Sequence, residues 1–116
     1  MSGRRSERET IEDIIKELSP YSVTTTDAND KTIRTPASGK RFRVGFIYVW
    51  NASGGGLTIN GFRFGDGTYH FKGKLSDATG FLMNVVGANW KGAVNEEFMV
   101  KASGAGLEVT VFGEDT

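Results

Sequence analysis

The sequence predicts a mainly β protein: an antiparallel β-sandwich, jelly-roll-like and of about eight strands, preceded by one N-terminal amphipathic α-helix. Up to Leu18 the apolar residues recur at helical spacing, and after Ser19-Pro20 they alternate as strands do. Glycine occupies 16 of the 116 positions, which is typical of many tight turns between short strands. We therefore expect an N-terminal arm and helix over residues 1–20 and a single sandwich domain over residues 21–116.

The predicted helix carries one apolar stripe, with its members at positions i, i+3, i+4 and i+7. The stripe consists of Ile11, Ile14, Ile15 and Leu18. Ser6 and Glu9 have the spacing of a capping box at the start of the helix, and Pro20 ends it. So short a helix is marginal in water, so its stripe needs a surface to pack on. We expect it to dock on a neighbouring subunit or a partner protein; the alternative is that it covers its own sandwich.

Turn residues divide the remaining chain into alternating segments that we predict as strands. These segments are residues 21–26, 31–35, 41–50, 57–64, 68–75, 80–86, 97–102 and 107–112. Asn60-Gly61 lies between two short alternating runs and is the best hairpin signal in the chain, so we expect a reversal there.

Residues 41–50 form the strongest predicted strand, and its large apolar residues share one face. We assign that face, Phe42, Val44, Phe46, Tyr48 and Trp50, to the core. Much of the remaining core should come from Leu57, Ile59, Phe62, Phe64, Phe81, Val85, Phe98, Val100, Leu107, Val109 and Val111. If the assigned face is buried, replacing Phe46 by alanine would cost about 3–5 kcal/mol.

The residues contain no recognisable catalytic chemistry, so we expect no enzymatic activity, no cofactor and no metal site. Cysteine is absent, which excludes disulfides, thiolate metal sites and cysteine nucleophiles. His70 is the single histidine, and its place in a predicted strand points it to solvent. Trp50 and Trp90 are the candidates for a ligand-stacking platform, although aromatic residues on sandwich strands usually belong to a core or an interface.

The formal net charge is zero, so bulk electrostatics predict neither a nucleic-acid nor a membrane partner. No apolar signal segment is recognised near Met1, so we expect synthesis in the cytoplasm without export through the secretory route, and we expect the Asn51 sequon to be unused. Every charged residue between positions 31 and 65 is basic, whereas most of the charged residues between positions 92 and 116 are acidic. This asymmetry describes either ordinary solvated strands or complementary surfaces of neighbouring subunits.

Two stretches resemble small β-sandwich virion proteins of tailed phages and prophages. The first, residues 32–44, has a short strand before a Pro-Ala-x-Gly-Lys-x-x-x-Val motif. The second begins with a Gly80-Phe81 strand and continues with Val86-Gly87-Ala88-Asn89-Trp90, Asn95-Glu96-Glu97-Phe98-Met99-Val100 and a final Leu107-Glu108-Val109-Thr110-Val111 strand. The resemblance covers about residues 22–112.

The resemblance implies a structural protein of the virion without an enzymatic site. The first expectation is a capsid decoration protein and the second is another head or tail component. Its partners would be the major capsid or tail protein and copies of itself, in a trimer or another closed ring, an arrangement that exposed strand edges also favour. The alternative from another class is a carbohydrate-binding module that uses Trp50 or Trp90.

Overall fold

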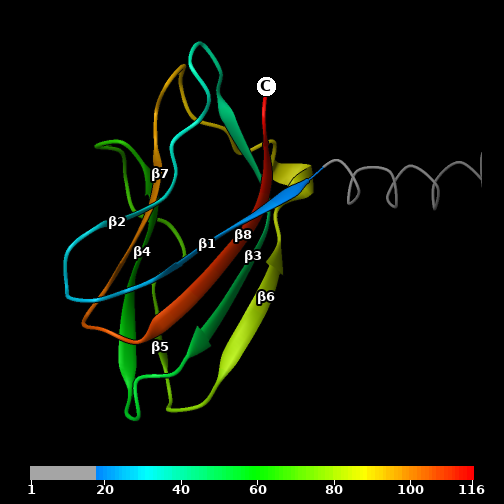
Figure 1. The fold of residues 1–116 in the computed structure, drawn as a ribbon. Coiled ribbons are helices and arrows are strands. Elements are labelled where there is room, and N and C mark those ends of the chain that lie inside the picture. The colour runs from blue at the N-terminus through cyan, green and yellow to red at the C-terminus, as the bar shows by residue number, and fades with distance from the viewer. Residues whose placement is uncertain (1–17) are drawn as a thin grey trace, which may run out of the picture.

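The computed structural model describes residues 18–116, which form eight strands and one short 3₁₀ turn. The strands are β1 (Ser19–Thr24), β2 (Lys31–Arg34), β3 (Phe42–Asn51), β4 (Leu57–Phe64), β5 (Gly73–Leu75), β6 (Gly80–Asn84), β7 (Phe98–Ala102) and β8 (Leu107–Asp115), with the turn η1 at Val86–Ala88. Figure 1 shows them as two layers that face each other, β1, β8, β3 and β6 in one and β2, β7, β4 and β5 in the other. The predicted β-sandwich is confirmed.

The strand order is that of a rolled hairpin. Within the sheets, which are antiparallel throughout, β1 pairs with β8, β2 with β7, β3 with β6 and β4 with β5. These four nested pairs are further joined by β3 to β8 and by β4 to β7. Nested antiparallel pairs that split into two packed four-stranded sheets are the arrangement of a jelly roll.

The core lies between the two sheets and is almost wholly apolar. Its centre is a group of packed aromatic rings, in which Phe98 lies 6.0 Å from Phe62, 6.0 Å from Phe42 and 4.7 Å from Phe64 between ring centroids. The predicted core residues of β4, β7 and β8 are buried, while Phe81 is partly buried and packs against them. Ile33, Ile47, Val49 and Ala102 also belong to the core, although the sequence pattern did not select them.

A β-bulge in β3 reverses part of the predicted inward face. Phe42 and Val44 point into the core as expected, but the register shifts between Val44 and Phe46. Gly45 is the extra residue, and beyond it the side chains change sides. Ile47 and Val49 are therefore fully buried, whereas Tyr48 is 42% exposed. The assignment of Phe46, Tyr48 and Trp50 to the core was wrong, because a single inserted residue inverts a period-two pattern.

The predicted reversal at Asn60-Gly61 is also wrong, because β4 continues through both residues. The register shifts between Ile59 and Gly61, so this pair forms a bulge opposite β7 rather than a turn. Gly61 has a φ of +139°, a conformation that side chains other than glycine's rarely adopt. The chain reverses later, and the segment before β5 pairs with β4 only through the bridge between His70 and Phe62.

The predicted helix lies outside the described residues, except for its last member, Leu18. Leu18 is buried and is not helical, and β1 begins directly after it at Ser19. Pro20 lies inside β1, opposite Phe112 of β8. β1 is an edge strand of the described sheet, where a proline is tolerated because its nitrogen can face away from the ladder.

Asn51 is the one fully buried amide of the described core, and it joins the β3–β4 and β5–β6 connections at one end of the sandwich. Its Nδ2 donates to the carbonyls of Gly55, Leu75 and Ser76 at 2.8, 3.2 and 3.1 Å. Its Oδ1 accepts a hydrogen bond from the Ser53 amide at 3.0 Å. This burial leaves the Asn51 side chain inaccessible to a glycosylating enzyme in the folded protein.

We expect Ile47→Ala to lower the free energy of unfolding by about 2–5 kcal/mol, because Ile47 is fully buried between the sheets. Phe46→Ala should cost less than about 1.5 kcal/mol, because Phe46 is only partly buried on the outer side of β3. Urea denaturation of both variants provides the measurement. A larger loss for Phe46→Ala than for Ile47→Ala would contradict the bulge at Gly45.

We expect Asn51→Ala to destabilise the fold by roughly 2–4 kcal/mol, since it removes four partly buried hydrogen bonds and leaves a cavity at a fully buried position. Asn60→Ala is the matched control, because Asn60 is an exposed residue of β4. Thermal and urea denaturation should separate the two variants clearly. Equal stability of both would show that the loop carbonyls find other donors.

Candidate functional site

The solvent side of the β1–β8–β3–β6 sheet carries several large apolar side chains, and we call it the outer face from here on. Cross-strand neighbours share a face, so the register of the sheet defines its rows. One row brings Tyr48 beside Leu82 and Thr110, and the next brings Phe46 beside Phe112 and Asn84. Trp50 follows along β3 in the next row, between Gly80 and Glu108.

These outer-face side chains remain accessible. Leu82 is 63% exposed and Tyr48 is 42% exposed, and the two lie opposite each other on neighbouring strands. Phe46, Trp50 and Phe112 are partly buried around them. A contiguous group of apolar side chains on a sheet face is typical of a surface that binds another protein.

Leu18 lies at one end of this outer face. It precedes Pro20 by two residues, and its side chain packs over Gly45 of β3. A Cβ atom added at Gly45 would lie 2.5 Å from Leu18 Cδ1 and 3.0 Å from the Phe112 carbonyl oxygen. The bulge glycine therefore makes room for Leu18. Of the predicted docking stripe, only Leu18 is placed, and Ile11, Ile14 and Ile15 lie outside the described residues.

The uneven distribution of charge along the chain is partly balanced inside the subunit. Bases of the early strands pair with acids of the last strand, Arg34 with Asp115 and Arg43 with Glu114. The Thr32 hydroxyl also donates to the Glu97 carboxylate at 2.8 Å. These contacts use several of the charges that were considered for complementary subunit surfaces.

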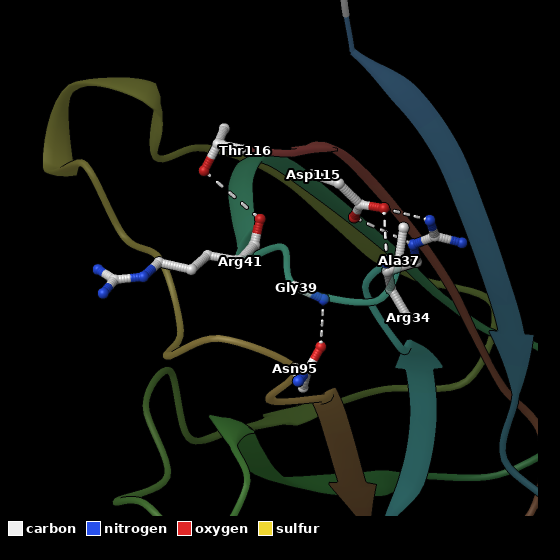
Figure 2. Close-up of polar contacts among 7 residues, drawn as sticks. All are labelled: Arg34, Ala37, Gly39, Arg41, Asn95, Asp115 and Thr116. Atoms are coloured by element: carbon white, nitrogen blue, oxygen red, sulfur yellow. Dashed lines mark hydrogen bonds and ion pairs between the residues drawn. The ribbon is translucent and has the colours of Figure 1, made fainter.

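The loop with the Pro-Ala-x-Gly-Lys motif crosses from one sheet to the other, between β2 and β3. Figure 2 shows how it is held: the Asp115 carboxylate accepts hydrogen bonds from the Arg34 guanidinium and, at 2.9 Å, from the Ala37 amide. The Gly39 amide donates to Asn95 Oδ1 at 2.7 Å. The backbone of Arg41 exchanges two hydrogen bonds with Thr116. In this chain the motif therefore fastens the two sheets together.

Trp50 and Trp90 do not form a common platform. Trp50 lies on the outer face of β3, whereas the Trp90 carbonyl accepts a hydrogen bond from Val44 near the opposite end of that strand. Val44 and Trp50 are six positions apart along β3, which is about 20 Å of extended strand. The Trp90 ring closes the end of the core, where it meets Phe64 and Phe98 edge-on at 5.7 and 5.1 Å.

Among residues 18–116 no cluster of three or more His, Asp or Glu side chains could hold a metal ion. His70 is exposed, as predicted. The centroid of its ring lies 6.4 Å from that of Phe71 and 5.4 Å from that of Trp90. No helix in the described part of the chain has the length and apolar character to cross a membrane.

Comparison with known protein families, curated proteins and solved structures finds no match to this chain. The resemblance to small phage virion proteins therefore rests on the sequence motifs alone. What the structure adds is the sandwich itself and the placement of apolar side chains on one of its outer faces.

We expect the contact between Asp115 and Arg34 to make the free energy of unfolding depend on pH in the acidic range. The Arg34 guanidinium, and after it the Ala37 amide and the charge of Lys40, hold the pKa of Asp115 below its ordinary value of 3.8. A carboxyl group whose pKa is lowered by folding stabilises the protein fully above its unfolded pKa, and this contribution is lost as the pH falls through the folded pKa. The stability gap between wild type and Asp115→Asn should therefore be widest above pH 4 and narrow towards pH 2. Urea denaturation over this range measures the gap, and a constant gap would contradict the ion pair.

Proposed function

We propose that this protein is a structural component of the virion of a tailed virus, most simply a capsid decoration protein or another head or tail protein. It acts by protein–protein assembly and performs no catalysis. The observation that carries this proposal is the outer face, where large apolar side chains stand in solvent on a sheet that is otherwise well packed. The jelly-roll arrangement agrees with it, since this architecture is common in viral capsid proteins and also occurs in lectins.

The N-terminal stripe supplies a second contact in this proposal. Leu18, which is the last member of the stripe, lies on the outer face. β1 begins directly after it at Ser19. Ile11, Ile14 and Ile15 would then reach the surface of a neighbouring subunit or of the major capsid or tail protein. Burial of each of these side chains would contribute roughly 1.5–3 kcal/mol to docking. Copies of the subunit form a trimer or another closed ring on the particle.

The decisive experiment is electron microscopy of purified virus particles or of capsids expressed together with this protein. The proposal predicts regularly repeated density that antibodies to this protein label. Particles that lack the protein, with the protein present only in the surrounding lysate, would contradict it. Single, unclustered copies on the particle, together with a monomer in solution at high concentration, would contradict the closed ring alone.

We expect Tyr48→Lys with Leu82→Lys to abolish self-association and incorporation into particles while the fold keeps its stability. Both side chains are exposed on the outer face, so charges there interfere with a partner and not with the core. Val94→Lys with Ala105→Lys is the matched control, because these exposed residues lie in loops outside that face. Sedimentation velocity and particle incorporation give the readouts. Normal assembly of the first variant would exclude the outer face as the contact.

We expect deletion of residues 1–17 to leave the sandwich folded, because every described strand lies beyond that point. Incorporation into particles should nevertheless be lost, since the deleted residues carry three of the four members of the stripe. The melting temperature and the particle-bound fraction are measured together. A sharp fall in melting temperature would instead show that the stripe covers its own domain.

A further inference from the structure

The other sheet carries an accumulation of positive charge on its outer side. A hollow of about 360 Å³ opens there, between the first half of β4 and the segment that leads into β5. Its lining includes Lys72, Lys74 and Lys101, and it contains no acidic residue. None of these three lysines forms an ion pair with a carboxylate of residues 18–116. Three ammonium groups around one hollow produce a positive potential that attracts an anion.

The bulge at Gly61 builds this hollow. It lets the segment around Tyr69 approach the backbone of β4, where Phe62 and His70 exchange two hydrogen bonds of 2.9 and 2.8 Å. A Cβ atom at Gly61 would lie 2.8 Å from both Tyr69 Cβ and the His70 carbonyl oxygen. The Asn-Gly pair that suggested a turn therefore leaves the space in which Tyr69 packs, and this packing also positions the segment that carries Lys72.

Tyr69 is a fixed wall of the hollow. Its hydroxyl donates to Asp30 Oδ1 at 2.6 Å, and the Arg63 guanidinium lies over its ring, 4.3 Å from the centroid. Arg63 is itself paired with Asp30 at 2.9 Å, so this neighbouring carboxylate is already engaged. Lys101 Nζ lies 6.0 Å from the Tyr69 ring. The surrounding cations therefore exceed the acids that could balance them.

The polar lining indicates what kind of anion fits. Besides the lysines, the hollow presents the amide of Asn60 and the hydroxyl of Thr58, groups that exchange hydrogen bonds with sugar hydroxyls. Gly73 leaves open space at its rim. A volume of about 360 Å³ lies in the range of small-ligand sites. Nucleic acid fits less well, because a strand needs an extended basic track with open aromatic faces, and the Tyr69 ring is covered by Arg63.

We propose that this hollow binds an anionic saccharide, that is, a sugar carrying a carboxylate, sulfate or phosphate group. Lys72, Lys74 and Lys101 hold the anionic group, and Asn60 and Thr58 bind the hydroxyls of the ring. The site lies on the sheet opposite the outer face, so one subunit can assemble through one sheet and hold a saccharide on the other.

Calorimetric titration of the full-length protein tests this with three sugar probes: a heparin-derived tetrasaccharide, a tetramer of galacturonic acid and neutral cellotetraose. At least one acidic oligosaccharide should bind at least tenfold more tightly than cellotetraose. Lys72→Gln with Lys74→Gln and Lys101→Gln should weaken that binding at least tenfold. The charge-matched control is Lys40→Gln with Arg41→Gln and Lys91→Gln, which should keep the wild-type affinity. Equal losses in both triple variants would overturn the site, because they would reflect bulk charge.

Two further probes separate the saccharide from other anions. One probe is inorganic sulfate and the other is a single-stranded DNA oligonucleotide of equal charge. If either binds as tightly as the acidic sugar, the assignment to saccharides is overturned. Asn60→Ala with Thr58→Val should weaken sugar binding at least threefold and leave sulfate binding unchanged. Melting curves verify that each variant is folded, and failure of all three sugars to bind the folded wild type overturns the proposal.

Discussion

The pairing of β8 between β1 and β3 is the interaction on which the sandwich depends. It joins residues far apart in the chain, such as Ser19 and Gly113, and it supplies the centre of the first sheet. The nested strand order means that this sheet lacks its centre until the last strand is in place. Because long loops must close before such contacts form, the pairing of β8 carries a large entropic cost, and the contact of Asp115 with the loop between β2 and β3 helps to hold its end in place.

The strands could be predicted from the sequence, whereas the direction of their side chains could not. Alternation and turn residues located all eight strands approximately, because a half-buried strand needs apolar residues at every second position. Beyond Gly45, however, β3 is apolar on both sides, and nothing in the pattern reveals an inserted residue. Asn60-Gly61 was misread for a related reason. The same local preference for unusual backbone angles serves a tight turn and a bulge, and only pairing with β7 decides between them.

The sequence pattern indicated even fewer of the residues that form the outer face. Tyr48 was assigned to the core and Leu82 was not selected, although these two side chains define the outer face. An exposed apolar residue and a buried one look alike in a sequence, since exposure depends on which strand lies opposite. The clearest local motif, at Ala37 and Gly39, fastens the two sheets together and offers no exposed chemistry. The exposed side chains that form the candidate surface therefore lie at positions that no sequence motif marks.

Pro20 makes the two edges of the first sheet unequal. β1 and β6 both lack a second neighbour among the described residues, so each could accept a strand from another chain. A strand added beside β1 would find no amide hydrogen at Pro20, and one of its carbonyl groups would remain unsatisfied. β6, from Gly80 to Asn84, has a donor at every residue. In the first sheet, addition of a strand is therefore less favourable beside β1 than beside β6, which opposes the open-ended stacking of strands that leads to fibres.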